Sequence, residues 1–377
     1  MNQRARLQWY RWEGIYTVDV TLAGLAQRVQ AVADLLRAQQ RSCLVACDTR
    51  FMGAQFARYA YQMLDMAGVR VGLCPTPASV AMVELAIERR RFESALMLSA
   101  GNRPYWYAGL HALLPAADAE PFAALPAAPD PAPPFPPELS PLPEHAHADL
   151  RGPYLELLRE VADMDLIRRS TLTVFVDPMN GPASGLFPAL LGEGAQTRAV
   201  EINREADPLF NRQIPSPAET GFPRLRKLVK ESDSHMGVAI SADGRALGVT
   251  DNSGEVATPL ELALLLAQHL ARHHRLRGHV VVPFQPDMPA GIAAWESATG
   301  LKVEPSGQPA ARVAELVAQD RTALLVGVTE LGEPTLGRYS GSADAAMAAL
   351  LLTEMIAVNG GKLRAQLDDL RARIQQP

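Results

Sequence analysis

Apolar residues along this chain fall into two alternating patterns. Stretches with apolar side chains at helical spacing are followed by short continuous apolar runs, and turn residues separate them. Helical spacing predicts amphipathic helices, and short runs bounded by turn residues predict buried strands. In the first third of the chain we expect helices at 21–40, 54–67 and 79–89 and strands at 43–47, 69–73 and 94–98. Such alternation favours a parallel sheet covered by helices.

The same alternation returns twice further along the chain. After a helix at 154–161, the second stretch has strands at 172–176 and 236–240, an intervening segment at 194–202 and a helix at 224–231. The third stretch has helices at 259–273, 290–299 and 310–319, with strands at 279–283, near Lys302 and at 322–326. A last apolar helix is expected at 342–357, and a polar helix rich in Arg, Asp and Gln follows Gly361. Three comparable stretches predict three α/β units in tandem.

A segment of different composition separates the first two units. Between Pro115 and Pro143, 11 of 29 residues are proline, a density that no helix or central strand tolerates. We interpret this segment as an extended spacer with polyproline character; the alternative is a binding site for a proline-recognising partner. The resulting boundaries are residues 1–114 for the first domain, 115–148 for the Pro/Ala-rich linker, 149–257 for the second domain, 258–360 for the third and 361–377 for a polar C-terminal helix or tail.

Composition and charge narrow the class of protein. The chain has 377 residues, 48% of them hydrophobic and 20% charged, which is enough apolar surface for several stable cores. Because the formal net charge is −5 and no basic stripe alternates with aromatic residues, we expect no nucleic-acid partner. No apolar run reaches the roughly 18 residues needed to cross a bilayer, and the N-terminus lacks a secretory signal, so we expect a cytoplasmic protein without membrane contact. The cysteines, Cys43, Cys47 and Cys74, are expected to be buried thiols.

The candidate chemistry begins after the strand expected at 94–98. The segment LSAGNRPYWYAGLH, residues 98–111, resembles the phosphoserine loop of the α-D-phosphohexomutases, the phosphoglucomutase/phosphomannomutase family, usually written TASHNPxxYNGxK. In that family the loop serine carries the phosphoryl group that is exchanged with the sugar. Aligned without gaps, the serine position falls on Gly101, and Asn102 and His111 replace the histidine and lysine. Ser99 is a nearby hydroxyl, either a substitute nucleophile or a group that caps the loop.

Several other segments carry the same resemblance. CDTRFMG is similar to the D-x-R-x-S element with Asp48 and Arg50 kept, and Arg50 either clamps a phosphate or pairs with a nearby carboxylate. RWEGIYTV is similar to FGTDGIRG, with Tyr16 in place of the arginine that faces phosphate. The turns of the second domain are matched by VDPMNGPASG at 176–185 and DPLFNRQIPSP at 207–217.

The resemblance also assigns a metal loop. GVAISADGRALGVTDNSGE, residues 237–255, is similar to GIAxDGDADRxxxVDxxG, whose three aspartates bind Mg²⁺ in the family. The three positions are Ser241, Asp243 and Arg245 here, so one carboxylate is kept. Mg²⁺ prefers oxygen ligands, and a guanidinium near 4 Å would repel it by about 1 to 4 kcal/mol. We therefore expect Arg245 to pair with Asp243 and to replace the ion.

The third domain supplies a candidate sugar-binding loop. VGVTELGEPTLG, residues 326–337, lies where the family has GGExSG, and Thr329 and Glu330 are the candidate sugar contacts that the resemblance implies. Asp344 follows as the expected cap of a helix. The phosphate-binding loop of the family's fourth domain, RxSGTEP, has no counterpart in the sequence, so we expect no fourth domain.

The resemblance implies three phosphohexomutase-type α/β/α domains with mixed sheets. Because the serine and metal positions are altered, we expect a catalytically inactive protein that binds a sugar phosphate or acts as a regulator or scaffold, without a cofactor. The alternative is an active phosphoglucomutase/phosphomannomutase-type enzyme with an altered site, for which the resemblance implies Mg²⁺. Expected partners are a sugar phosphate, another protein, or a second copy bound through the first domain.

Overall fold

The structure is a computed structural model that describes residues 7–115, 122 and 142–375. These residues form two compact units, which are described separately. The N-terminal unit comprises residues up to Tyr154, with two short additions, Asn180–Pro182 and Ala206–Pro215. The C-terminal unit comprises Leu155–Met179, Ala183–Glu205 and Ser216 onwards.

The N-terminal unit contains a five-stranded sheet in the order β1-β5-β4-β2-β3. Its strands are β1 (Leu7–Ile15), β2 (Cys43–Cys47), β3 (Val71–Leu73), β4 (Ser94–Leu98) and β5 (Tyr107–Pro115). β2 runs parallel to β3 and β4, as the alternating pattern predicts, whereas β5 is antiparallel to both β1 and β4. The expectation of a parallel sheet is therefore wrong for β1 and β5, and the mixed sheet implied by the family resemblance is confirmed. β5 follows β4 through a short loop, and so short a connection joins antiparallel neighbours.

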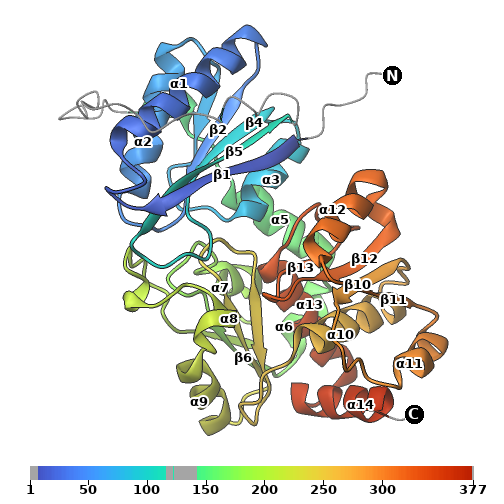
Figure 1. Cartoon of the computed structure of the whole chain (residues 1–377). Helices are drawn as coiled ribbons and strands as arrows, with labels where there is room; N and C mark the ends of the chain where they lie inside the picture. The colour runs from blue at the N-terminus through green and yellow to red at the C-terminus, as the bar shows by residue number, and fades with distance from the viewer. Residues whose placement is uncertain (1–6, 116–121, 123–141, 376–377) are drawn as a thin grey trace. The chain divides into compact units, whose positions relative to one another are not determined.

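Helices of this unit enclose one large core. They are α1 (Leu22–Ala38), α2 (Gly53–Met66), α3 (Val80–Glu88) and the short η2 (Glu144–Ala146). α1 and α2 pack together on the sheet face that carries alternate residues of β2, β4 and β5 (Figure 1). Thr21 and Ser79 cap α1 and α3 by accepting a backbone N–H at the third helical residue. The carboxyl ends of β2 and β4 are thereby fixed side by side.

The first sheet of the C-terminal unit has the order β7-β6-β8-β9. Its strands are β6 (Thr173–Asp177), β7 (Arg198–Glu201), β8 (Met236–Ile240) and β9 (Leu247–Thr250). The connecting helices are α5 (Arg151–Val161), α6 (Met164–Arg169), α7 (Leu186–Leu191), α8 (Pro217–Thr220) and α9 (Pro223–Glu231), whereas the short η3 (Phe210–Arg212) belongs to the N-terminal unit. β6 is parallel to β7 and β8, and β9 returns antiparallel to β8 after a tight loop. That loop carries the residues of the predicted metal loop.

The second sheet of this unit has the order β11-β10-β12-β13. Its strands are β10 (His279–Pro283), β11 (Lys302–Ser306), β12 (Leu324–Val328) and β13 (Pro334–Thr335). The helices are α10 (Pro259–Arg272), α11 (Ile292–Thr299), α12 (Pro309–Gln319), η4 (Arg321–Ala323), α13 (Ala345–Asn359) and α14 (Leu363–Gln375). β13 is antiparallel to β12, so this sheet is mixed as well.

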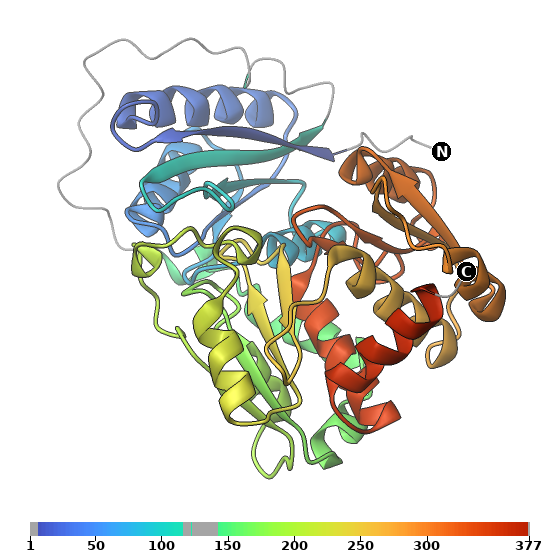
Figure 2. The same cartoon turned by 60° about the horizontal axis from the view of Figure 1, so that its bottom comes forward.

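α13 is the central helix of the C-terminal unit. It contacts α6, α10, β8 and β9, and Figures 1 and 2 show it between the two sheets of that unit. Every residue from Ala345 to Ile356 is buried, as expected for a helix that is apolar on all sides. Asp344 caps this helix through the amide of Met347, as the sequence analysis expected. Glu354 is the charged residue on this buried helix, and its partners are discussed below.

Three other expectations concern individual segments. Most of the proline-rich segment, residues 116–121 and 123–141, lies outside the described residues. Cys43, Cys47 and Cys74 are buried free thiols, as expected. Within the described ranges, no single helix is long and apolar enough to cross a membrane, and the pair α13 and α14 meets that test only when joined across an 88° bend.

Candidate functional site

The loop after β4 holds the position that the resemblance assigns to the phosphoserine. Gly101 occupies it with a φ of 52°, in the left-handed region that glycine adopts at little cost. Ser99 is buried, and its Oγ donates to Asp48 Oδ2 at 2.7 Å and accepts from the Gly101 amide at 3.0 Å. The Ser99 hydroxyl therefore links Asp48 to the backbone of the loop, and it both donates and accepts a hydrogen bond within the protein.

Arg50 follows the neighbouring strand β2 and is surrounded by the same loop. Its Nε donates to Asp48 Oδ2 at 3.2 Å. The two terminal nitrogens donate to four backbone carbonyls, those of Gly101 (2.5 Å), Arg103 (2.8 Å), Pro104 (3.0 Å) and Tyr107 (3.4 Å). A guanidinium has five N–H donors, so the structure uses every one of them within the protein. Of the two roles considered for Arg50, the structure shows the pair with a carboxylate.

Asp48 is the buried anion of this arrangement. Burial raises the pKa of Asp48, although the Arg50 guanidinium and the Ser99 hydroxyl oppose that effect. Its Oδ1 also accepts the Arg50 amide at 2.9 Å. Removing one partner of such a buried ion pair typically costs about 3 to 5 kcal/mol, because the other charge is left uncompensated. Asp48 and Arg50 together determine the conformation of the loop from 99 to 107.

A second polar group links β1 to β5. His111 Nε2 lies 2.7 Å from Glu13 Oε1, and Arg103 Nε lies 3.3 Å from Glu13 Oε2. Burial raises the pKa of Glu13, but hydrogen bonding and charge from His111, with Arg11 and Arg103, lower it to about 2. The motif resemblance pointed to His111, whereas no sequence pattern pointed to Glu13 or Arg103. Since β1 was not recognised as a strand, nothing indicated that Glu13 faces β5.

Aromatic residues surround the loops of this unit. Tyr16, which the sequence resemblance places at the family's phosphate-facing arginine, packs edge-on against Phe51 with ring centroids 5.7 Å apart. The Tyr16 amide donates to the Trp106 carbonyl at 2.9 Å, and Trp106 packs against Tyr105 at 4.9 Å. Phe51 and Trp106 are about half exposed. These loops therefore present exposed aromatic carbon at Phe51 and Trp106.

The predicted metal loop lies between β8 and β9 in the C-terminal unit. Ser241 is fully buried, and its Oγ donates to Asp243 Oδ1 at 2.6 Å and accepts the amides of Arg245 and Ala246 at 3.2 and 2.8 Å. Asp243 Oδ1 also accepts the Arg245 amide at 3.1 Å. Gly244 turns the chain with a φ of 79°. The loop is a closed turn in which Ser241 and Asp243 bind backbone amides.

The side chain of Arg245 points to another carboxylate. Its Nη2 lies 3.6 Å from Glu333 Oε2, whereas its contact with Asp243 shown above is made by the backbone amide. Glu333 is therefore a side-chain partner of Arg245 that no sequence pattern indicated. Glu333 also accepts a hydrogen bond from Thr329 Oγ1 at 3.2 Å. Glu330 lies at the exposed tip of the turn, so the structure brings Thr329 but not Glu330 into this group.

These residues do not fit the Mg²⁺ ion that the family resemblance implies. Mg²⁺ needs near-octahedral oxygen ligands, preferably charged. The three positions offer a hydroxyl and a carboxylate oxygen already engaged in hydrogen bonds, and a guanidinium. The Arg245 guanidinium in the ligand set opposes a dication, and Asp243 is the one carboxylate among the three positions.

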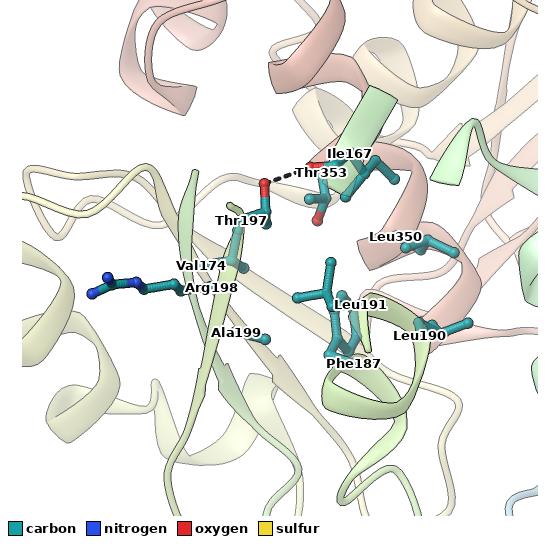
Figure 3. Close-up of a pocket in the computed structure, with 10 residues that line it drawn as sticks. All are labelled: Ile167, Val174, Phe187, Leu190, Leu191, Thr197, Arg198, Ala199, Leu350 and Thr353. Carbon is teal, nitrogen blue, oxygen red and sulfur yellow. Dashed lines mark hydrogen bonds between the residues drawn. The ribbon is translucent and has the colours of Figure 1, made fainter. Parts of the chain in front are cut away.

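A cavity elsewhere in the C-terminal unit is apolar. It is lined by side chains of β6, β7, α6, α7 and α13, among them Phe187, Leu191 and Leu350 (Figure 3). Arg198 contributes to its wall, but its guanidinium points away from the cavity (Figure 3). Thr197 Oγ1 donates to the Ile167 carbonyl at 2.5 Å. The cavity therefore offers packing space without a charged group for a phosphate.

Comparison with known proteins assigns two parts of the chain to a family. Residues 9–120 match the family model "Phosphoglucomutase/phosphomannomutase, alpha/beta/alpha domain I", and residues 152–254 match that of domain II. A phosphoglucosamine mutase of Sphingopyxis alaskensis is 26% identical over 352 residues, covering 89% of this chain and 75% of that protein. A putative phosphomannomutase from Thermus thermophilus has the same fold, with a TM-score of 0.82 at 22% identity over 99% of this chain and 85% of that one.

Other relatives match over shorter stretches. A phosphoglucosamine mutase of Thermodesulfovibrio yellowstonii is 28% identical over 142 residues, which is 36% of this chain and 29% of that protein. A probable phosphoglucosamine mutase of Pyrococcus abyssi is 29% identical over 41% of this chain and 32% of its own length. The chain thus spans about a third of these two relatives. The two family models together cover more than half of the chain, which belongs to the phosphoglucomutase/phosphomannomutase family.

Proposed function

We propose that this chain is a member of the family that does not transfer phosphate and that acts by binding, as a regulator or scaffold. The observation that carries the proposal is the loop after β4. The phosphoserine position is Gly101, which has no oxygen to phosphorylate. The N–H groups of Arg50 could have bound a phosphate, but all of them donate hydrogen bonds to Asp48 and to backbone carbonyls of the loop.

The metal loop supports the same proposal. Phosphoryl transfer depends on placing positive charge where negative charge develops, and a divalent cation commonly supplies it. Here the Arg245 guanidinium is paired with Glu333, and Asp243 accepts hydrogen bonds from Ser241 and from the backbone. We therefore propose that the chain works without Mg²⁺ at Ser241, Asp243 and Arg245. The serine that is phosphorylated in the family and two of its three metal-binding aspartates are thus replaced at the positions that the resemblance assigns to them.

The exposed aromatic residues favour a protein partner over a sugar phosphate. Phe51 and Trp106 are about half exposed on loops of the N-terminal unit, and Tyr and Trp are enriched at protein interfaces. Arg103, on the same loop, has a largely exposed side chain and is paired with Glu13. A homodimer formed through the first domain would use the same unit. A cytoplasmic location stays a prediction.

Intact-mass spectrometry after incubation with a hexose bisphosphate tests the proposal directly. We expect no phosphate uptake by this chain, whereas an active phosphoglucosamine mutase, treated in parallel, gains one phosphate. Incubation with hexose 1-phosphates should likewise give no 6-phosphate product. A phosphorylated chain, or turnover that Arg50→Ala abolishes, would contradict the proposal.

The alternative is an active phosphosugar mutase with an altered site. Its support is the alignment to a phosphoglucosamine mutase along most of this chain. In that case Ser99 would have to exchange its hydrogen bond to Asp48 for a phosphoryl group, and Gly101 would lose the acceptor of its amide. Peptide mapping separates the two functions, because phosphate on Ser99 that is absent from Ser99→Ala supports the enzyme.

A further inference from the structure

We propose that His269, His274 and Glu354 form a binding site for a divalent transition-metal ion such as Zn²⁺. The three residues lie in the C-terminal unit, away from the Ser241 to Arg245 loop. His269 is in the last turn of α10, His274 follows its end, and Glu354 is on α13. One potential ligand atom from each residue lies within 4.8 Å of the others.

The ligand atoms converge on one point. His269 Nε2 lies 2.6 Å and His274 Nε2 lies 2.7 Å from the same oxygen, Glu354 Oε2. The other oxygen, Oε1, accepts the backbone amide of Asp163 at 2.6 Å, which fixes the orientation of the carboxylate. Zinc binds imidazole nitrogen and carboxylate oxygen at about 2.0 to 2.2 Å, so small outward shifts of the three side chains would admit the ion.

This cluster is more buried than a group of histidines on a protein surface. Glu354 is completely buried and His269 is nearly so, while His274 is partly buried. A buried carboxylate requires compensation by charge or by hydrogen bonds. Two imidazoles supply hydrogen bonds, and a dication would supply charge as well. The side chain of His274 is 14% exposed, and a zinc ion held by three protein ligands takes water as its fourth ligand.

A second layer of residues orients the ligands. Tyr339 Oη lies 3.1 Å from His274 Nδ1, the ring nitrogen that faces away from Glu354. When Nε2 binds a metal, the proton resides on Nδ1 and is donated to that oxygen, an arrangement common among metal-binding histidines. His273 stacks on His269 with ring centroids 5.4 Å apart, and its Nε2 is 4.0 Å from Glu354 Oε1.

The donor set selects the class of ion. Two imidazoles with one carboxylate suit Zn²⁺, Co²⁺ or Ni²⁺, whereas Mg²⁺ and Ca²⁺ prefer oxygen alone. A bound ion would link the end of α10 to the middle of α13. Because α13 is the central helix of this unit, the ion would act as a structural clamp on it. The alternative is a hydrogen-bonded cluster in which both imidazoles donate N–H to Glu354.

Zinc titration of the full chain against a chelator of known affinity decides between these alternatives. We expect one Zn²⁺ per chain, and Co²⁺ in its place should show the intense visible absorption of a four- or five-coordinate site. His274→Gln should weaken zinc binding at least about tenfold, since it removes one of three ligands. The absence of stoichiometric zinc binding would overturn the proposal.

Control variants keep the test independent of folding. Tyr339→Phe removes no ligand and should weaken binding about 10- to 100-fold, the usual effect of a residue that orients a ligand. His279→Gln, at a half-exposed histidine paired with Glu304, should leave the affinity unchanged, as should Asp243→Asn in the predicted metal loop. Equal zinc affinity in wild type, His274→Gln and Tyr339→Phe would show that the ion binds elsewhere and would refute the site.

Discussion

Arg50 donates a hydrogen bond from Nη2 to the carbonyl oxygen of Gly101 at 2.5 Å. The guanidinium therefore holds the backbone at the position that the sequence resemblance assigns to the phosphoserine. In an arginine that binds phosphate, these N–H groups would point outward to a ligand. Here they are the internal support of a loop that has no hydroxyl at its centre.

Replacing Arg50 by Ala should destabilise the N-terminal unit by about 3 to 5 kcal/mol, because Asp48 would remain as a buried, uncompensated carboxylate. Chemical denaturation followed by tryptophan fluorescence can measure the loss, since three of the four tryptophans, Trp9, Trp12 and Trp106, lie in this unit. Arg103→Ala is the matched control: its side chain is 63% exposed, and the change should cost less than about 1 kcal/mol. Equal effects of the two changes would argue against a special role for Arg50.

Gly101→Ser should not restore phosphorylation. The new hydroxyl would lie beside an arginine that is already occupied, and the metal loop would still lack two carboxylates. With a φ of 52°, a side chain at this position costs about 1 to 2 kcal/mol, so the melting temperature should fall by a few degrees. Intact mass after incubation with a hexose bisphosphate is the readout. A phosphorylated variant would show that the loss of the serine alone had stopped the chemistry.

Glu13 should make stability depend on acid pH. Its pKa is lowered from 4.5 to about 2 in the folded chain, which corresponds to roughly 3 kcal/mol at 1.36 kcal/mol per unit. A lowered pKa stabilises the fold fully above pH 4.5, and the contribution is lost as pH falls toward 2. The difference in unfolding free energy between wild type and Glu13→Gln should therefore shrink over this window. A difference that stays constant down to pH 2 would contradict the assignment.

The ion pair between Arg245 and Glu333 should contribute to the stability of the C-terminal unit. Glu333→Gln should destabilise the C-terminal unit by about 1 to 3 kcal/mol, since it removes a carboxylate that pairs with the Arg245 guanidinium in a largely buried loop. The double change Arg245→Met with Glu333→Gln should cost less than the sum of the single changes, which a double-mutant cycle measures.

Mg²⁺ should not raise the melting temperature of the wild-type chain by binding to the loop that contains Ser241, Asp243 and Arg245. Adding millimolar Mg²⁺ to wild type and to Asp243→Asn should give the same small, non-specific response in both proteins. A stabilisation of wild type that Asp243→Asn abolishes would show that the loop binds the ion despite Arg245.

Much of the fold follows from local patterns. The helices at Leu22–Ala38 and Pro259–Arg272 and the strands at Cys43–Cys47 and Met236–Ile240 lie close to the expected ranges, because spacing and turn residues act over neighbouring positions. The strands β1, β5, β9 and β13 were missed. β1 lies at the edge of its sheet and is only half buried, so its apolar pattern is weak, and the segment of β5 was interpreted through its motif alone.

The sequence by itself determined the family. Its motifs also led to the expectation that Gly101 stands at the phosphoserine position and that Ser241, Asp243 and Arg245 stand at the metal positions. Tertiary structure alone decided which groups meet. Glu13 and His111 are 98 positions apart, and His269 and Glu354 are 85 apart, yet each pair is in hydrogen-bonding contact. Charge pairing depends on the distance between two side chains in space. The packing of whole strands and helices determines that distance, and local sequence patterns do not reveal it. For that reason Arg245 could be recognised in the sequence as an intruding cation, but its partner Glu333 could not.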